Sequence, residues 1–261
     1  MKILVCLKQV VDVELNIQLK DGQIADQGLR YVINAYDESA LEAALQLKDA
    51  AEADVTVLSI GPDRVLEALR KGLSMGADRA IHLKDDAFNG SDSYAFAKAV
   101  SELAKQRSYD LIIMGKQAQD TDAAQGGPML AEFLDWPQAT NLIFVQRAPE
   151  GGLMVRRVGD EGKEVLSVQT PAVLTISNDF GEARIPTMKG IMGAKKKEIE
   201  TLSLSSIGVA ADAVGATGSK TEIVNREQPE GRKTGRKVTG EVGAITRELV
   251  NWLVNDGKLP V

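Results

Sequence analysis

The chain contains 261 residues, of which 44% are hydrophobic and 26% charged, a composition typical of a globular protein. Its single cysteine, Cys6, excludes an internal disulfide, and its single histidine, His82, leaves too few soft ligands for a zinc site of the histidine and cysteine type. Aromatic residues make up only 4% and the net charge is −6, so general nucleic-acid binding, which needs stacking and basic side chains, is not expected.

No stretch of the sequence reaches the roughly 18 consecutive apolar residues that a membrane-spanning helix needs. The chain opens on an apolar run over residues 2–7, which is too short for the hydrophobic core of a signal peptide. We therefore expect a bacterial cytoplasmic protein that is not embedded in a membrane.

The N-terminal part of the chain alternates apolar runs with helical patterns. Residues 2–7 predict a strand, and residues 37–50 carry apolar side chains at helical spacing, with Asp37 as a candidate N-cap. The same alternation predicts strands over 54–60, 79–83 and 110–114 and helices over 63–74 and 92–106. Continuous apolar runs separated by helices indicate a parallel sheet that is covered on both faces and joined by right-handed βαβ connections.

From about residue 139 the pattern changes to short strands joined by glycine-rich turns. The strand candidates are residues 141–147, 153–158, 164–168 and 172–176, which we interpret as antiparallel strands appended to the parallel sheet. The predicted fold class is therefore α/β, a Rossmann-like three-layer domain with appended antiparallel strands.

Beyond residue 183 the character changes again. Residues 184–240 contain eleven Lys and Arg against six Asp and Glu, and residues 209–240 show no sustained apolar period. A segment of this length without a core of its own is either disordered or ordered against another chain. Residues 241–256 resume helical spacing, and this terminal helix either docks on its own domain or, with the extended arm before it, wraps a partner subunit.

In a parallel α/β sheet, ligands bind outside the carboxyl ends of the strands, where the strand order reverses. Three predicted loops leave such ends: those after Leu7 and Ile60, and a long loop over residues 115–128. The long loop is rich in small residues and enters a helix, whose N-terminus favours a phosphate. It matches neither the Walker loop nor the G-x-G-x-x-G pattern, so spacing alone leaves open a nucleotide site or a merely tight turn.

Individual residues near these loops allow more than one interpretation. Asp120 and Asp122 would repel a phosphate, so we expect them to cap the turn or to bind ribose hydroxyls. Asn34 either hydrogen-bonds an adenine edge or ribose, or forms a plain Asx turn. Cys6 is expected to be a small core residue, because burial disfavours the thiolate, and His82 to be structural.

A second candidate surface lies in the basic segment. Met188 and Met192 precede the run over residues 195–197, which consists of lysines. Flexible methionines among basic residues suit a surface that packs against several partners, and the alternative is a small satellite core.

A set of short motifs extends from residue 3 to about residue 210. They include VCLKQVVD at 5–12, INAYDE at 33–38, MGADRA at 75–80, GKQA at 115–118 with Asp120, Asp122, Gln125 and Gly127 after it, WPQAT at 136–140, RVGDEG at 157–162 with Glu164, PAVLT at 171–175, and Arg184 followed by IM at 191–192 and AKKK at 194–197. Together they resemble the beta subunit of electron transfer flavoprotein, a heterodimeric family. The resemblance implies a fold like that of adenine nucleotide alpha-hydrolases, with a nucleotide-binding domain over residues 1–183. It further implies a partner-recognition segment over 184–200, and an arm and helix over 201–261 that wrap the alpha subunit.

The resemblance also implies a function. The chain would be an electron-carrier subunit, not an enzyme, that serves acyl-CoA or other flavin dehydrogenases and passes electrons to a membrane quinone-reducing oxidoreductase or another acceptor. It would bury a structural AMP and help to enclose an FAD held mainly by the alpha subunit. The implied AMP site is Cys6, Asn34, Ala35, Tyr36, Asp37, Ile60, Gly115, Lys116, Gln117, Ala118, Gln119, Asp120, Thr121, Asp122, Ala123, Ala124, Gln125 and Gly126. The implied partner-binding residues are Met188, Ile191, Met192, Lys195, Lys196 and Lys197.

The sequence departs from the family pattern in three places. Ala35 replaces a usual proline, Val13 stands where some relatives carry a tyrosine near the flavin, and residues 123–126 are smaller than in many AMP-binding members. Members that bifurcate electrons also have small residues there and hold a second FAD with NADH nearby, which is the alternative within the family. A stand-alone domain that binds or hydrolyses adenine nucleotides is the alternative outside it. Against that alternative, the S-G-G-x-D-S pyrophosphate loop is absent from the sequence.

Overall fold

The computed structural model describes residues 1–15, 17–20, 22–25, 28–228, 235, 237–255 and 257. The chain divides into two compact units, Met1–Asn225 and Arg226–Val261, and each is described by itself.

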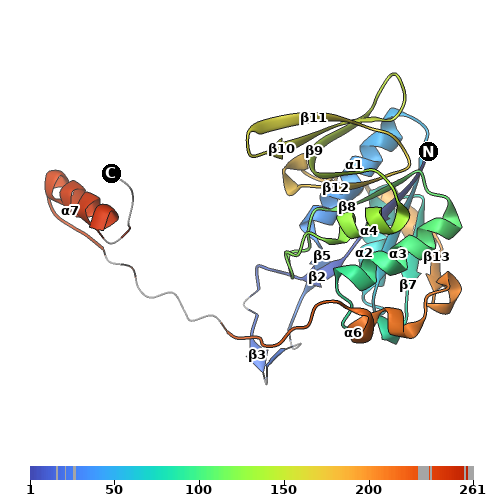
Figure 1. The fold of residues 1–261 in the computed structure, drawn as a ribbon, viewed down its shortest axis with the longest axis horizontal. Helices are drawn as coiled ribbons and strands as arrows, with labels where there is room; N and C mark the ends of the chain where they lie inside the picture. Colours follow the sequence, from blue (N-terminus) through green and yellow to red (C-terminus); the bar gives the residue numbers. More distant parts are fainter. Residues whose placement is uncertain are drawn as a thin grey trace. The chain divides into compact units, whose positions relative to one another are not determined.

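The first unit is built on a large mixed sheet (Figure 1). Its strands are β1 (Lys2–Cys6), β6 (Asp54–Ile60), β7 (Arg79–Leu83), β8 (Leu111–Gly115), β9 (Gln138–Arg147), β10 (Leu153–Gly159), β11 (Gly162–Val168), β12 (Ala172–Ile176) and β13 (Ile199–Leu202). The helices of this unit are α1 (Ala35–Ala50), α2 (Val65–Met75), α3 (Ser93–Arg107), α4 (Gly126–Leu134), α5 (Met188–Lys196) and the short α6 (Gly215–Gly218). Short strands β2 (Gln9–Val11) and β5 (Tyr31–Ile33) pair with each other, as do β3 (Leu19–Lys20) and β4 (Gln23–Ile24).

The strand order places a switch point beside β1. The order across the sheet is β11-β10-β9-β12-β8-β1-β6-β7-β13. Strands β1, β6 and β7 are parallel neighbours that step outward in one direction, whereas β8 returns to the other side of β1 and pairs with it in parallel. The loops that leave the carboxyl ends of β1 and β8 therefore diverge, which is the position where open α/β sheets bind ligands.

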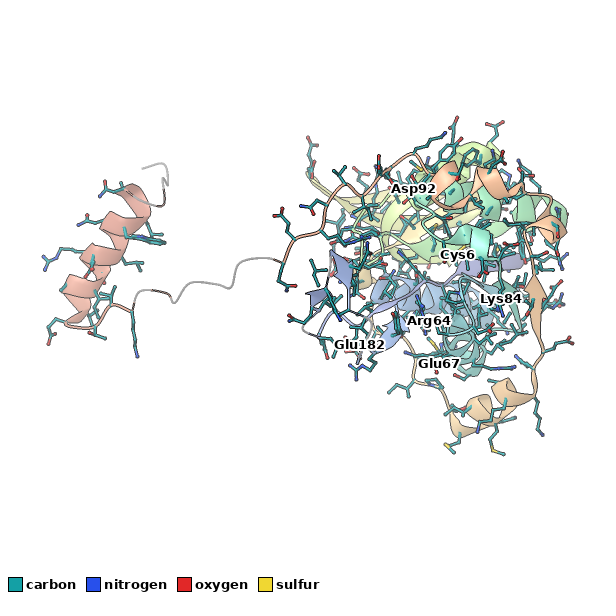
Figure 2. The ribbon with its side chains drawn as sticks, turned by 90° about the horizontal axis from the view of Figure 1, so that it is seen from below. Cys6, Arg64, Glu67, Lys84, Asp92 and Glu182 are labelled. Atoms are coloured by element: carbon teal, nitrogen blue, oxygen red, sulfur yellow. The ribbon has the colours of Figure 1, made fainter. Side chains whose placement is uncertain are left out.

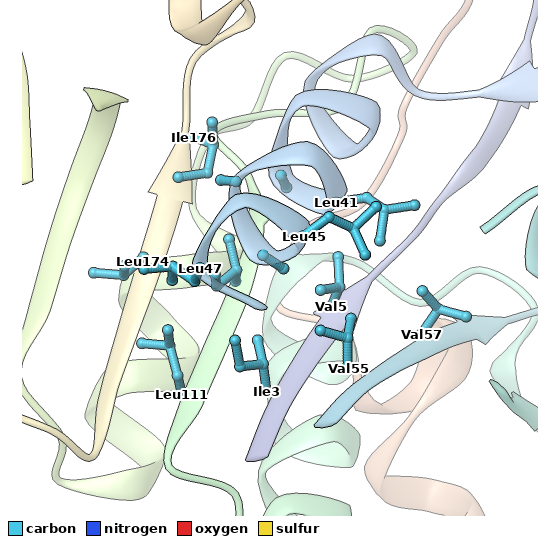
Figure 3. Close-up of a cluster of buried hydrophobic side chains, with 14 of the residues drawn as sticks. Ile3, Val5, Leu41, Leu45, Leu47, Val55, Val57, Leu111, Leu174 and Ile176 are labelled. Atoms are coloured by element: carbon cyan, nitrogen blue, oxygen red, sulfur yellow. The ribbon is translucent and has the colours of Figure 1, made fainter. Parts of the chain in front are cut away.

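The central strands are buried on both faces, as their continuous apolar runs predict. Along β1, Ile3 and Val5 join the core beneath α1 and α2, while Leu4 and Cys6 join the core on the side of α3 and α4. Figure 3 shows the first of these cores, with Leu45 of α1 beside the strand that carries Val5. Helices thus cover both faces, and the predicted three-layer α/β fold is confirmed.

The antiparallel extension is smaller than the sequence pattern suggested. Strands β9, β10 and β11 form an antiparallel series, as predicted. The prediction of an antiparallel strand over residues 172–176 is wrong, because β12 lies between β8 and β9 and is parallel to both. All five residues of β12 are buried and four of them are apolar, a pattern like that of the other parallel strands and not an alternating one.

The segment after residue 183 contributes more to the first unit than its sequence indicates. Strand β13 pairs in parallel with β7 at the edge of the sheet. The chain then returns across α3, and Ile207, Val209 and Val214 are buried in the core on that side. We had predicted that residues 209–240 lack a core. The first residues of this stretch, Val209 and Val214 among them, belong to the core instead.

The second unit contains the helix predicted over residues 241–256. This helix, α7, spans Val242–Asn255. Most of its apolar side chains are exposed, including Leu249 and Trp252, which are each about half exposed.

Candidate functional site: a cleft at the carboxyl ends of four parallel strands

A cleft with a volume of about 1310 Å³ is lined by the residues that follow β8, β1, β6 and β7. Small-molecule sites typically have volumes of roughly 300–1,000 Å³, so this cleft has room for a nucleotide. Figure 2 labels three of its lining residues: Cys6 at the end of β1, Lys84 after β7, and Asp92 at the start of α3.

A buried carboxylate holds the two strand ends at the switch point. Asp37, in the first turn of α1, accepts hydrogen bonds from the backbone N–H of Lys8 at 2.7 Å and of Gly115 at 2.8 Å. Burial raises the pKa of Asp37 to about 6, although both hydrogen bonds favour the ionised form. Asp37 therefore joins β1 to β8 instead of capping its own helix.

We had predicted that Asp37 is the N-cap of α1. The N-cap is instead Asn34, and its side chain makes no capping hydrogen bond. Its amide instead donates to the carbonyl oxygen of Gln117 at 2.8 Å, and its oxygen accepts from the backbone N–H of Gln119 at 3.1 Å. Both polar atoms of the side chain are thus used to position the loop after β8. Of the two alternatives that the sequence leaves open for Asn34, the side chain does not form the Asx turn but makes a contact across more than 80 residues of sequence.

The loop over residues 116–125 has a backbone shape that suits an anion. Asp122 and Ala124 have φ values of 49° and 53°, in the left-handed region, and Gln125 returns to φ −105° and ψ −21°. Left-handed Ala124 and right-handed Gln125 form one mixed pair, and a pair of this kind turns successive N–H groups toward one concavity. No side chain caps the N-terminus of α4, which begins at Gly126, so its first N–H groups also point into this region.

The two acidic residues of this loop are engaged at its surface. Asp120 forms an exposed ion pair with Lys8 at 2.7 Å, and Asp122 accepts a hydrogen bond from the side-chain amide of Gln117 at 2.7 Å. Both carboxylates thus bind side chains of the protein, and neither accepts a backbone N–H among the described contacts, as a residue that caps the turn would.

The structure brings most of the expected site residues to one cleft. Those that line it are Cys6, Asn34, Asp37, Ile60, Gly115, Lys116, Gln117, Ala118, Asp120, Thr121, Ala123, Ala124, Gln125 and Gly126. Four others, Ala35, Tyr36, Gln119 and Asp122, lie outside its lining. Ala35 instead borders a shallow groove formed with Glu38, Asp179 and Glu182.

A second wall of the cleft was missed by sequence reasoning. It is formed by residues 84–93, after β7, and by residues 216 and 219–223 near the end of the first unit. The strand-end rule could have found the first part, because β7 is parallel to β6 and ends at the same edge of the sheet. No local pattern indicates the second part, since it reaches the cleft only by tertiary packing.

The two residues with reactive side chains are structural in this fold. Burial raises the pKa of the Cys6 thiol well above its usual range, and the nearby Asp37 acts in the same direction, so the thiol stays protonated. His82 is buried in β7, and its Nε2 lies 2.8 Å from the carbonyl oxygen of Gly61. Both findings agree with the expectation from the sequence.

The expected partner-binding residues lie on helix α5. Met188 and Met192 are 74% and 63% exposed and Ile191 is 39% exposed, which makes them an apolar surface and not a satellite core. Thr187 caps the helix by accepting a hydrogen bond from the backbone N–H of Gly190 at 3.1 Å. Lys195 and Lys196 occupy the last turn.

Helix α5 is fixed to α2 by cationic side chains. Arg70 of α2 donates to the carbonyl oxygens of Ala194, at 2.6 Å, and of Lys197. Lys197 in turn donates to the carbonyl oxygen of Ala77 at 2.6 Å. The ammonium group of Lys197 therefore binds its own domain, while the apolar side chains of α5 remain exposed.

Among the described helices, none combines the length and the apolar character that are needed to cross a membrane. The sheet topology and the cleft define the class of the protein. It is a three-layer α/β protein with a large cleft at the switch point of its parallel sheet.

Comparison with known proteins gives the family. Residues 21–207 match the family model of the electron transfer flavoprotein domain. The electron transfer flavoprotein subunit beta of Thermoanaerobacterium thermosaccharolyticum is 38% identical over 257 residues, which cover 97% of this chain and 98% of the relative. The subunit of the same name from Syntrophomonas wolfei is 36% identical and covers 100% and 99%, and that from Megasphaera elsdenii is 39% identical and covers 90% of both. The chain belongs to the family of electron transfer flavoprotein beta subunits.

Proposed function

We propose that this chain pairs with an alpha subunit in an electron transfer flavoprotein that carries electrons from acyl-CoA or other flavin dehydrogenases to a membrane quinone-reducing oxidoreductase or another acceptor. In this proposal the cleft holds a structural AMP. The observation that carries the proposal is the location of the cleft, at the switch point of a parallel sheet, in a chain that belongs to this family.

The residues present fit an adenosine monophosphate. Residues 123–126 supply N–H groups for the phosphate, since the N–H of Asp122 donates to the carbonyl oxygen of Ala118, and the N-terminus of α4 adds a partial positive charge. Lys116 lies in the same lining and adds a formal positive charge. The apolar ends of β1 and β6, with Cys6 and Ile60, offer a surface for the base.

The redox cofactor of the proposed complex is an FAD held mainly by the alpha subunit. When bound, the flavin accepts and donates the electrons, and the residues of this chain bind and enclose it. Helix α7, whose apolar side chains Leu249 and Trp252 are exposed within its own unit, is proposed to pack with the preceding arm on the alpha subunit.

The dehydrogenase is proposed to dock on α5. Electron transfer between proteins requires a contact that forms and dissolves quickly, which favours a small interface with one or two apolar anchors. Met188 and Met192 are exposed and flexible, and Lys195 and Lys196 stand beside them. Met188, the most exposed of these apolar side chains, is the proposed anchor.

One observation supports a second candidate within the family. The cleft volume of about 1310 Å³ exceeds the usual range of small-ligand sites, so a dinucleotide also has room. The alternative function is an electron-bifurcating complex with a second FAD in this cleft and a site for NADH nearby.

The decisive experiment is to co-express the chain with its alpha subunit, denature the purified complex, and quantify the released nucleotides by chromatography. We expect one AMP and one FAD per heterodimer. Two FAD and no AMP would replace the main proposal by the alternative, and a complex with FAD alone would contradict both assignments of the cleft.

A further inference from the structure

The last residues of the first unit form part of the cleft. We call residues 215–223 the strap. Six of its residues line the cleft: Ala216, Ser219, Lys220, Thr221, Glu222 and Ile223. The strap ends two residues before Asn225, where the first compact unit ends.

Hydrogen bonds attach the strap to the loop between β7 and α3. The backbone N–H of Gly215 donates to the hydroxyl of Ser91 at 2.8 Å. The backbone N–H of Ala216 donates to the carbonyl oxygen of Asn89 at 3.2 Å, and the hydroxyl of Ser219 donates to the carbonyl oxygen of Gly90 at 2.9 Å. The absence of a side chain at Gly90 allows this close contact, because a Cβ there would lie 3.3 Å from the Cβ of Ala216.

Asp92 connects the strap to helix α3, with one carboxylate oxygen for each. Its Oδ1 caps the helix by accepting from the backbone N–H of Tyr94 and of Ala95, both at 3.0 Å. Its Oδ2 accepts from the backbone N–H of Lys220 at 2.7 Å, and from the backbone N–H and the hydroxyl of Thr221 at 2.9 and 3.0 Å. Three donors of the strap thus converge on one charged oxygen, and such bonds are about twice as strong as neutral ones.

Two further side chains of the strap, Lys220 and Ile223, belong to the cleft lining. The ammonium group of Lys220 lies 5.3 Å from the centroid of the Tyr94 ring, so its side chain is directed along α3. Beyond Thr221 the strap carries Ile223, which is 65% exposed although it is apolar and lines the cleft. An apolar residue in that position gains burial when a ligand fills the space beside it.

We infer that the strap is a wall of the nucleotide site, and that Asp92 is a positioning residue that slows release of the nucleotide by holding this wall closed. The inference rests on the proposed binding of AMP in the cleft. It adds residues from the C-terminal end of the first unit to a site otherwise built from strand ends.

Asp92→Asn separates the two roles of the carboxylate. Asparagine keeps Oδ1 as a good helix cap, but it places an NH₂ group opposite the N–H donors of Lys220 and Thr221. Asp212→Asn is the matched control, because Asp212 is an exposed carboxylate just before the strap that does not line the cleft and has no hydrogen bond to the strap among the described contacts. Both variants remove one negative charge, but only Asp92→Asn changes a contact of the cleft wall.

The test uses the full chain with AMP as the probe and measures two quantities for each variant: hydrogen exchange of the strap amides, and the rate of AMP dissociation. For Asp92→Asn we expect faster exchange over residues 219–223 and dissociation that is about tenfold faster. Asp212→Asn should match the unchanged chain in both. If Asp92→Asn does not fold, the double variant Ser219→Ala and Thr221→Val weakens the same contact from the strap side and should change both quantities in the same direction.

Three results would overturn the inference. Faster exchange of the strap with an unchanged AMP dissociation rate would show that the strap is not part of the site. Unchanged exchange would show that Asp92 does not hold the strap. If the unchanged chain binds no AMP at all, the proposed nucleotide site itself fails, and this result is distinguishable because it precedes any substitution.

Discussion

The carboxylate of Asp37 accepts a hydrogen bond from the backbone N–H of Gly115 at 2.8 Å across 78 residues of sequence. The contact is close because Gly115 has no side chain: a Cβ there would lie 2.6 Å from the Cβ of Tyr36. The second oxygen of Asp37 binds the N–H of Lys8. The first turn of α1 thereby fixes the carboxyl ends of β1 and β8, between which the strand order reverses.

This arrangement predicts a dependence of stability on pH. Burial raises the pKa of Asp37 from 3.8 to about 6, so between these values the folded chain binds more protons than the unfolded chain. The contribution of Asp37 to the free energy of unfolding should therefore fall as pH rises from about 4 to about 6, by about 3 kcal/mol, and stay constant above. Urea denaturation of the native chain and of Asp37→Asn over this pH range measures it.

The difference between the two unfolding free energies, native minus variant, should decrease by that amount as pH rises. Asp86→Asn, at an exposed carboxylate, is the control and should leave the pH profile unchanged. Parallel profiles for the native chain and Asp37→Asn would contradict the prediction and place the pKa of Asp37 near its ordinary value.

Gly126→Leu should reduce AMP binding. A Cβ at this position would lie 3.2 Å from the Cε of Met114 and 3.6 Å from the Phe96 ring, and both residues line the cleft. The rest of a leucine side chain therefore takes space that the proposed ligand occupies. Isothermal titration with AMP should show at least a tenfold weaker Kd, an order-of-magnitude expectation for losing close backbone contact with an anion.

Gly193→Leu is the matched control, because an added Cβ at Gly193 meets nothing within 4 Å. That variant should bind AMP as the native chain does. Full affinity in Gly126→Leu would mean that the ligand does not approach the start of α4.

Met188→Ala should weaken docking of a dehydrogenase on the heterodimer. Met188 is 74% exposed at the start of α5, and truncating an apolar anchor typically weakens binding by about 2 kcal/mol or more, which is roughly thirtyfold in affinity. The measurement is the apparent KM of an acyl-CoA dehydrogenase for the complex, together with its flavin absorbance. The flavin content should not change, because α5 is not part of the cleft lining.

Val165→Ala tests whether any exposed apolar residue has the same effect, since Val165 is 60% exposed on β11. We expect a normal KM for this control. An unchanged KM in Met188→Ala would refute its role as an anchor, and a loss of flavin would show that the residue supports assembly instead.

Arg184→Ala should destabilise the chain more at neutral pH than at acid pH. Arg184 donates to the buried carboxylate of Glu42 through its backbone N–H and its guanidinium group, at 2.8–3.0 Å, and also to Asp49. Burial alone would raise the pKa of Glu42, but the hydrogen bonds from Arg184 hold it below its ordinary value. This stabilisation is present above the unfolded pKa and is lost as pH falls.

Removal of the guanidinium group leaves Glu42 with an unpaired, largely buried charge, so we expect a loss of about 2 kcal/mol at pH 7. Denaturation at pH 7 and near pH 3 measures the difference. Arg157→Ala is the control, because the ion pair of Arg157 with Glu164 is exposed to solvent and should contribute little. Equal losses for Arg184→Ala at both pH values would contradict the electrostatic explanation.

The sequence by itself determined the fold class and three of the loops at the cleft. Runs such as residues 3–7 and 111–114 are apolar without alternation, and this pattern is typical of a strand buried on both faces. Helix periods are equally local, so α1, α2, α3 and α7 were predicted to within a few residues. The strand-end rule then located the loops after Leu7, Ile60 and Gly115, all of which line the cleft.

Only the tertiary structure decided which distant segments meet. The sequence of β12 does not reveal that this strand enters the sheet between β8 and β9, because parallel pairing depends on contacts far along the chain. The side chains of Asn34 and Asp37 suggested a helix cap or a ligand, yet they bind backbone groups more than 25 residues away. Likewise, the carboxylate of Asp92 accepts hydrogen bonds from the backbone N–H groups of Lys220 and Thr221 in the strap, which lie 128 and 129 residues further along the sequence. Local patterns record burial and period, whereas hydrogen bonds between remote segments depend on how the whole sheet brings those segments together.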